Sequence, residues 1–194
     1  MNKMDLNTIR STQPDPSERL PYYGRYIALV GQGDIVETLI DQQQKTVEEL
    51  SAIDGERANF RYAPDKWSIK EVLGHLTDTE RIFAYRALRI ARGDQTPIEG
   101  FEQDDYVRGA NFTACKWPDM IEEFTYVRRA SVSLFEHLSP EAWLRQGTAN
   151  QSAISVRALA YTMAGHEIHH RNILRDKYLQ GIQKPTAGSD ILNK

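Results

Sequence analysis

The sequence predicts an all-α fold, an antiparallel four-helix bundle with long connections between its helices. Four segments carry apolar residues at the three- and four-residue intervals of a helix, and residues that start or stop helices bound them. No period-2 strand pattern, internal repeat or low-complexity tract is evident. A chain of 194 residues with 40% hydrophobic content can bury one core, so we expect one bundle domain over residues 34–180.

An N-terminal arm precedes the first predicted helix. Residues 1–20 contain prolines and few large apolar groups, so we expect them to dock loosely or not at all and to carry no function. With the more apolar stretch that follows, they make an arm, residues 1–33, that packs on the bundle. Asp34 then caps a helix that runs to about Ile53. At the other end, residues 181–194 are rich in helix breakers and form a C-terminal tail.

The second predicted helix has the clearest start signal in the chain. Ser68, with Glu71 three residues later, forms a capping box in which each residue bonds the backbone of the other. The helix runs toward Arg92 and is stopped by Gly93. Its apolar stripe includes His75, which we therefore expect to face inward.

A long connection, residues 93–116, leads to the third predicted helix. It carries an acidic and aromatic cluster that either lines the entrance of a site or forms a solvated turn. This cluster includes Asp104, Asp105 and Tyr106. The third helix opens at Trp117, with proline at the next position, and ends near Leu138. A second connection, residues 139–153, follows it.

The fourth predicted helix, residues 155–178, places His166 and His170 four residues apart. Side chains at this spacing lie one above the other on a helix, so both imidazoles project from one face. Apolar residues at helical steps continue the same face: Val156, Leu159, Met163 and Ile173. Inward imidazoles without partners cost a few kcal/mol, so polar neighbours or a cation must lie beside them.

These histidines predict a mononuclear metal site. A lone histidine is usually a core or surface imidazole with an ordinary hydrogen bond. Two inward histidines on one helix, joined by His75 from another, instead make a three-imidazole site whose fourth position is open. His169 lies off the apolar stripe and His137 lies near the end of the third helix. We therefore leave both out of the ligand set.

Two other metal motifs overlap the fourth helix. The pattern H-E-x-x-H, residues 166–170, is the zincin protease signature, but no glutamate or histidine follows it to complete a downstream set. Glu167 and His170 also form Glu-x-x-His, which di-iron bundles use twice. No second copy is present, and the cap already uses Glu71, so we expect one ion rather than two.

Three segments resemble the DinB-like (DinB/YfiT) metal-binding bundle proteins. They are KWSIKEVLGHLTDTE, GFEQDDYV and SVRALAYTMAGHEIHHRNIL. The similarity runs from about Asp34 to Leu179 and rests on a His-Leu pair in one helix and His-x-x-x-His in another. It implies a four-helix bundle with a divalent metal, zinc or nickel, on His75, His166 and His170. Relatives include thiol-dependent S-transferases, an isomerase that uses a low-molecular-weight thiol, and proteins described as metal-dependent hydrolases.

The resemblance leads to two hypotheses about function. In the first, the protein is an enzyme whose ion activates a water or a low-molecular-weight thiol by lowering its pKa. Four polar residues near the ligands either orient imidazoles or serve as caps and surface charges: Glu71, Asp78, Thr79 and Glu167. In the second, a non-catalytic stress or interaction protein uses the metal as a structural pin. Structural zinc has four protein ligands and the sequence offers three, which favours the enzyme.

Composition narrows the choice of partners. With 24 basic and 27 acidic residues, the chain has no electrostatic footprint for nucleic acid, and we expect a small-molecule substrate. No apolar run approaches the ~20 residues of a membrane span, and the polar start lacks a signal-peptide core, so we expect no membrane and a cytoplasmic protein. The one cysteine, Cys115, excludes an internal disulfide but could be a reactive thiol.

A homodimer is expected from the family resemblance and from the third helix. Its apolar side chains spread over more than one stripe, so they cannot all turn inward: Phe124, Tyr126 and Val127.

Overall fold

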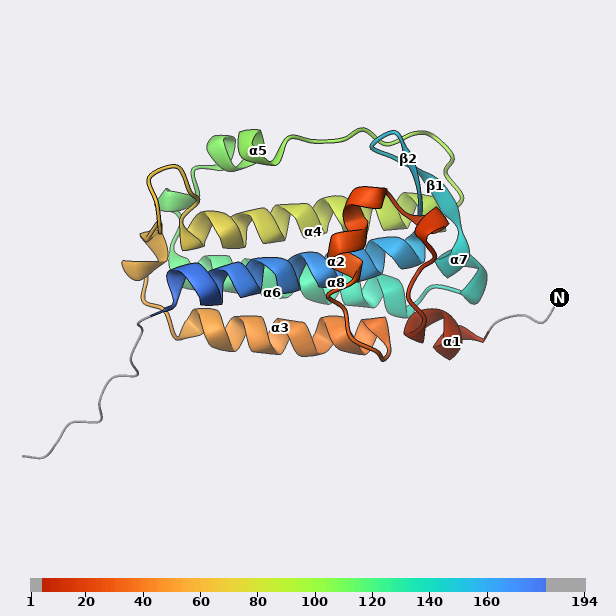
Figure 1. The fold of residues 1–194 in the computed structure, drawn as a ribbon, viewed down its shortest axis with the longest axis horizontal. Coiled ribbons are helices and arrows are strands. Elements are labelled where there is room, and N and C mark those ends of the chain that lie inside the picture. Colours follow the sequence, from red (N-terminus) through yellow and green to blue (C-terminus); the bar gives the residue numbers. More distant parts are fainter. Residues whose placement is uncertain (1–4, 181–194) are drawn as a thin grey trace, which may run out of the picture.

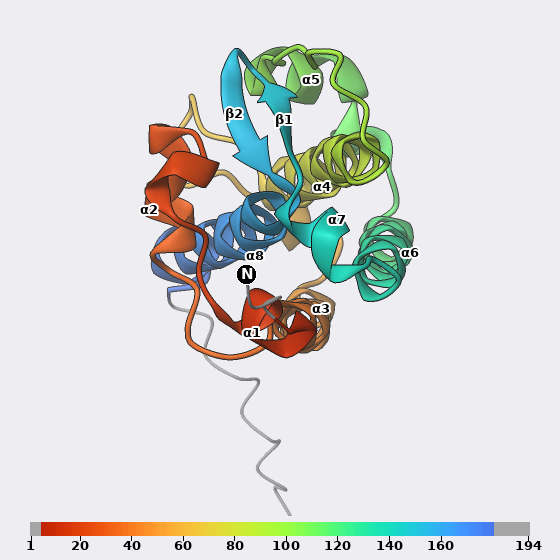
Figure 2. The ribbon, with the colours of Figure 1, turned by 90° about the vertical axis from the view of Figure 1, so that its right-hand side faces the viewer.

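The computed structural model describes residues 5–180 and confirms the four-helix bundle (Figure 1). Its long helices are α3 (Ile35–Ser51), α4 (Ile69–Ala91), α6 (Trp117–Glu136) and α8 (Val156–Ile173). Both α4 and α3 pack against α6 and α8 (Figure 2). Among residues 5–180, no helix is long and apolar enough to cross a membrane.

The connection between α4 and α6 gives the bundle its topology. It contains α5 (Gln103–Ala110) and runs back along α4, so that Lys70 near the start of α4 bonds the carbonyl of Cys115, just before α6. Helices α4 and α6 are therefore parallel. The indole N–H of Trp117, at the start of α6, bonds the carbonyl of Ile53 beyond the end of α3, so α3 and α6 are antiparallel. The predicted antiparallel order thus holds for some neighbours, including α4 and α8, but not for all.

The predicted helix ends agree with the structure to within a few residues. The Asp34 side chain accepts the backbone N–H groups of the first turn of α3. The capping box of α4 is formed, with Ser68 N–H bonded to the Glu71 carboxylate at 2.6 Å. Gly93, just beyond α4, has a φ of 84°, a conformation that favours glycine. Helix α8 continues into a single π-helical turn, Leu174–Tyr178.

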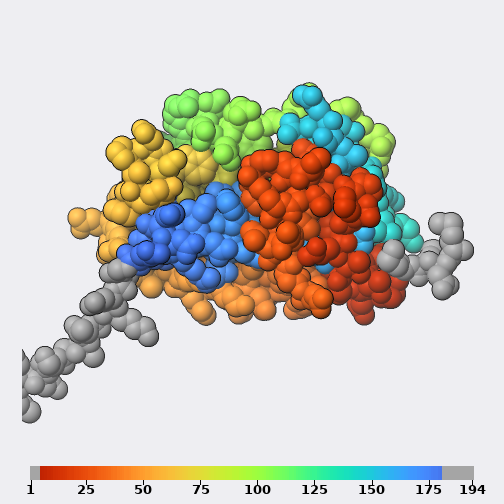
Figure 3. Space-filling view, viewed as in Figure 1, coloured from red at the N-terminus to blue at the C-terminus, as the bar shows by residue number. Residues whose placement is uncertain are grey.

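The arm packs more tightly than the sequence indicated. It contains α1 (Leu6–Ser11) and α2 (Gly24–Ile27), and Ile9 is fully buried. Helix α2 lies directly on α8, because a Cβ at Gly165 would stand 2.1 Å from the carbonyl oxygen of Tyr26. Figure 3 shows the red and orange arm covering part of the blue helix. The expectation of loose docking is therefore wrong for residues 5–20, whereas residues 1–4 and the predicted tail lie outside the described residues.

The connection between α6 and α8 contains structure that the sequence did not reveal. After α7 (Pro140–Leu144), β1 (Gln146–Ala149) and β2 (Ser152–Ser155) form an antiparallel hairpin. The two turn residues, Asn150 and Gln151, both have positive φ, as a tight hairpin turn requires. Strands of four residues are too short to show a period-2 pattern, which explains why none was evident in the sequence.

The core consists of two apolar clusters separated by a polar layer. One cluster contains Leu39 and Phe83 and extends to the arm, and the other contains Leu50 and Leu73. On each long helix, one or more buried polar residues lie between the part that joins the first cluster and the part that joins the second. This layer consists of Thr46, His75, Glu80, Arg128, His166, Glu167 and His170.

Candidate metal centre

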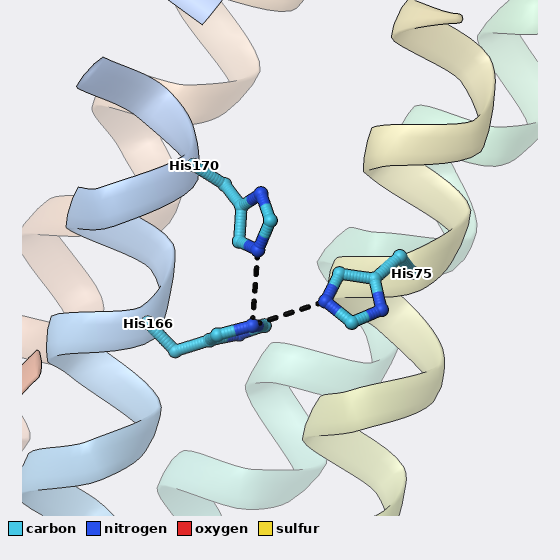
Figure 4. A group of neighbouring side chains, drawn as sticks. All are labelled: His75, His166 and His170. Atoms are coloured by element: carbon cyan, nitrogen blue, oxygen red, sulfur yellow. Dashed lines mark hydrogen bonds between the residues drawn. The ribbon is translucent and has the colours of Figure 1, made fainter. Parts of the chain in front are cut away.

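The structure brings together the three histidines that the sequence singled out (Figure 4). His75 comes from α4, and His166 and His170 come from successive turns of α8. The Nε2 atom of His166 lies 3.0 Å from Nε2 of His75 and 3.1 Å from Nε2 of His170. One ring nitrogen from each histidine lies within 4.8 Å of the others. The antiparallel packing of α4 on α8 creates this convergence between residues that are far apart in the sequence.

The three rings cannot satisfy one another by hydrogen bonding. A neutral imidazole nitrogen carries either one proton or one in-plane lone pair, so Nε2 of His166 can make only one good bond to its two neighbours. A cation, by contrast, accepts a lone pair from every ring. Tetrahedral zinc with ligands at about 2.05 Å holds its nitrogens about 3.3 Å apart, close to the 3.0 and 3.1 Å that separate Nε2 of His166 from the other two Nε2 atoms. The donor set therefore fits a divalent ion such as zinc.

Burial also keeps the rings neutral. It lowers the pKa of His75 to about 4. Burial, followed by the repulsion of neighbouring histidines, holds the pKa values of His166 and His170 well below the usual value. Lone pairs are therefore available at neutral pH without competition from protons.

Aromatic rings and one hydroxyl hold the imidazoles in place. The Tyr26 ring meets the His166 ring edge-on, with centroids 5.2 Å apart, and the Trp67 ring lies 4.7 Å from the His75 ring. Thr79 Oγ1 lies 3.4 Å from Nδ1 of His75. In the tautomer that leaves a lone pair on Nε2, Nδ1 carries the proton, and this hydroxyl is within reach to accept a hydrogen bond from it.

The other polar residues near the ligands have different partners. Glu71 caps α4 and pairs with Arg61, while Asp78 pairs with Arg81. His169 is partly buried and its ring lies edge-on to Tyr26. His137 is exposed and lies 2.6 Å from the carbonyl oxygen of Ser133. These positions agree with leaving both histidines out of the ligand set.

Glu167 turns away from the histidines. Its carboxylate lies 2.7 Å from the Arg128 guanidinium and accepts a hydrogen bond from Thr46. Arg128 also pairs with Glu80, at 2.6 Å. Burial alone would lower the pKa of Arg128, but the two carboxylates outweigh it and raise that pKa. Glu167 thus serves an ion pair and does not occupy the general-base position of H-E-x-x-H.

A cavity of about 450 Å³ opens beside the histidines. His75 and His166 form part of its wall, together with Thr79, Phe83 and Arg86 of α4. The arm supplies further lining residues: Leu20, Tyr22, Tyr23 and Tyr26. Sequence reasoning missed this role of the arm, although its three tyrosines within five residues were a visible signal. Leu20 shows that residues 1–20 contribute to the wall of this cavity.

The long connection lines the cavity with the three residues that come just before the ones we expected. Phe101, Glu102 and Gln103 line the cavity, whereas Asp104, Asp105 and Tyr106 are exposed on α5 and do not. Asp105 forms an ion pair with Arg108 at the surface. Of the two possibilities for these three residues, a site entrance or a solvated turn, the structure therefore agrees with the solvated one. Cys115 is a free, exposed cysteine.

Fold and site together define a four-helix bundle with a three-histidine centre beside an open cavity. The chain belongs to the DinB superfamily, whose family model matches residues 38–174. A solved structure with the same fold is YfiT from Bacillus subtilis, described as a probable metal-dependent hydrolase with an unusual four-helix bundle topology. The match has a TM-score of 0.61 and 12% identity, and covers 87% of this chain and 97% of YfiT. No match was found among curated proteins.

Proposed function

We propose that the protein is a metal-dependent enzyme in which His75, His166 and His170 hold one divalent ion. The observation that carries this proposal is that three buried, neutral imidazoles converge beside a cavity. Within residues 5–180, no fourth histidine, cysteine or carboxylate joins the group. A structural zinc site would have four protein ligands, so the cavity side is available to a substrate or water.

A zinc or nickel ion held there would supply a Lewis acid that makes a bound water or low-molecular-weight thiol nucleophilic at neutral pH. The chain's own residues contribute orientation and exclusion of water. Thr79 and Trp67 hold His75, and Tyr26 holds His166 and covers it from solvent. The cavity is of the size that accepts a small organic molecule.

Hydrolysis and thiol transfer are the two reactions that this site suits. The likeness to YfiT, itself described as a probable metal-dependent hydrolase, supports hydrolysis. The sequence resemblance to thiol-dependent S-transferases supports transfer of a thiol. A non-catalytic protein with a structural metal is the alternative, and the cavity beside the histidines argues against it.

Metal content of untagged protein tests the ligand assignment. We expect one zinc or nickel ion per chain in the wild type, and loss of the ion in His75→Ala, His166→Ala and His170→Ala, because two imidazoles hold it weakly. His137→Ala, at an exposed histidine, is the matched control and should retain full metal. Full metal in the three ligand variants would show that the assignment is wrong.

Reaction class requires a separate assay on the loaded protein. Activated esters and amides report hydrolysis, and an electrophile with a small thiol reports transfer. Turnover that disappears in His166→Ala and persists in His137→Ala identifies the reaction. Absence of turnover in both arms, with metal bound, would favour the structural role.

A homodimer stays a prediction. On α6, Phe124 is buried while Tyr126 is 57% exposed, so an apolar ring remains on the outer face of the helix. Sedimentation over a wide concentration range checks this, and a monomer throughout would remove the idea.

A further inference from the structure

Four arginines are buried within residues 5–180, and one of them lacks an acidic partner. Arg128 pairs with Glu80 and Glu167. The other two paired arginines are Arg157, which meets Glu18, and Arg171, which meets Glu49. Arg86 is only 1% exposed, and no carboxylate of residues 5–180 forms an ion pair with it. A buried cation without a counter-charge is costly, so this exception calls for an explanation.

The contacts of Arg86 leave part of its guanidinium unused. One terminal nitrogen donates to the carbonyl oxygen of Glu99 at 2.8 Å, and the other makes a long contact, 3.4 Å, with the Tyr23 hydroxyl. The Nε–H group is buried and has no hydrogen-bond partner. Because a guanidinium has five N–H donors in a planar fork, Arg86 retains the capacity to bind an oxyanion.

Arg86 lies in the same cavity as the histidines. Along α4, His75, Thr79, Phe83 and Arg86 follow steps of four, four and three residues, so they share one face, and all four line the cavity. The Cα atoms of His75 and Arg86 are about 16 Å apart along the helix.

Aromatic rings occupy the distance between the two ends. The Phe83 ring centroid lies 6.1 Å from that of His166 and 5.8 Å from that of Tyr23, whose hydroxyl contacts Arg86. The Phe101 ring centroid lies 6.0 Å from the Arg86 guanidinium. The cavity thus has an imidazole end, an apolar middle and a cationic end.

We propose that the substrate is a small organic carboxylate whose carboxylate pairs with Arg86 while its reacting group faces the three histidines. This inference rests on the metal-dependent function proposed above. The apolar body of the substrate packs among the rings of Tyr23, Phe83 and Phe101. A single negative charge fits better than a phosphate dianion, because the wall offers one guanidinium and the exposed Glu102 adds a negative charge at the rim.

Binding of simple probes tests the proposal without turnover. We would titrate the full-length protein with 3-phenylpropanoate, with its neutral amide and with 2-phenylethyl phosphate, by calorimetry. Each titration is made with zinc bound and repeated after chelation, because a carboxylate can also ligate a metal ion. The variants are Arg86→Met and Arg86→Lys, with Arg92→Met as the control at an exposed arginine near the end of the same helix.

We expect Arg86→Met to weaken 3-phenylpropanoate binding about tenfold to a hundredfold, with or without zinc, and to leave amide binding unchanged. Arg86→Lys keeps the charge but loses the fork, so its affinity should lie between those of Arg86→Met and the wild type. Arg92→Met should bind as the wild type does. Far-ultraviolet circular dichroism and thermal melting establish that each variant is folded, and if Arg86→Met does not fold, the Arg86→Lys result decides.

Four results would overturn the proposal. In the first, the Arg86 variants bind the carboxylate as tightly as the wild type does, and in the second, binding requires zinc but not Arg86. In the third, the phosphate binds more tightly than the carboxylate and depends on Arg86, and in the fourth, neither anion binds. In the last two cases Arg86 would be assigned to phosphate recognition or to anchoring the Glu99 carbonyl. If the histidine variants keep full metal while carboxylate binding still depends on Arg86, the proposed function alone is refuted and the Arg86 site stands.

Discussion

Two buried polar clusters lie side by side in the bundle and differ in how far they satisfy themselves. In the first, Arg128 of α6 joins Glu80 of α4 and Glu167 of α8, and Thr46 of α3 bonds Glu167, so every long helix contributes one residue. In the second, the three histidines come from α4 and α8, and Nε2 of His166 can make only one good hydrogen bond to the two Nε2 atoms that face it. The two clusters are adjacent, because His166 and Glu167 are neighbours in sequence.

This difference distinguishes a buried polar cluster that stabilises the fold from one that can bind a ligand. In the first cluster, which we call closed, one guanidinium lies between two carboxylates, so each charged group has an oppositely charged partner inside the bundle. The role of this cluster is to hold helices in register. The second cluster, the three histidines, which we call open, presents unmatched lone pairs beside a cavity and requires an outside group to complete it. The same contrast distinguishes Arg128 from Arg86, which are equally buried but only one of which has carboxylate partners. The predictions below test this distinction.

Removing the central cation of the closed cluster should have the largest effect. Arg128→Met leaves Glu80 and Glu167 buried without a counter-charge, which we expect to lower the free energy of unfolding by about 3–5 kcal/mol. Urea unfolding measures this, with Arg129→Met at the neighbouring exposed position as the control. Replacing Arg128, Glu80 and Glu167 together by apolar residues should recover most of the loss. A loss below about 1 kcal/mol for Arg128→Met would mean that the cluster is not a structural unit.

Completing the open cluster should stabilise the protein. At a free zinc concentration of 100 times the dissociation constant, binding adds about 2.7 kcal/mol to the free energy of unfolding. The same zinc should leave His170→Ala unchanged, because its site is incomplete. Thermal melting with and without zinc checks this difference. Equal stabilisation of the wild type and His170→Ala would place the ion elsewhere.

The hydroxyl beside the open cluster should affect metal affinity rather than folding. Thr79→Val removes the group that fixes the His75 tautomer, so we expect zinc affinity to fall by about tenfold. Thr77→Val is the matched control, since Thr77 is equally buried but bonds the carbonyl of Leu73. Competition with a chromophoric chelator measures both variants. An identical affinity for Thr79→Val and the wild type would contradict the positioning role.

The smallest effect is expected at the ion pair of Glu18 and Arg157, which lies away from both clusters and changes the stability as a function of pH. Burial by itself raises the pKa of Glu18, but hydrogen bonds from Arg157, the Asp15 backbone and Ser155 outweigh it and lower that pKa below its usual value of 4.5. The lowered pKa means that this pair stabilises the folded arm above pH 4.5, and that the stabilisation is lost as pH falls through the lowered value.

Glu18→Gln should therefore flatten the decline of stability between pH 5 and 3 while leaving metal content at neutral pH unchanged. Urea unfolding at a series of pH values provides the measurement. A steeper acid decline in the variant would reverse the sign argued here.

The sequence alone determined the features that depend on neighbours along the chain. Capping at Ser68 and Asp34 requires residues within one helical turn, and the pairing of His166 with His170 follows from four-residue spacing. The inward direction of His75 follows from its apolar stripe in the same way. These local hydrogen bonds and periodicities are formed by any helix, so they could be read before the fold was known.

Tertiary structure decided which distant groups meet. The parallel course of α4 and α6, the cover that Tyr26 provides over His166 and the short hairpin all depend on packing between segments far apart in the chain. Nothing near Arg128 or Arg86 in the sequence distinguishes their roles. Arg128 meets Glu80 and Glu167 because three helices converge on it, whereas Arg86 lies where α4 borders the cavity. The partners of a buried charge come from residues far apart in the sequence, so the pattern along the chain does not show which charge has a partner.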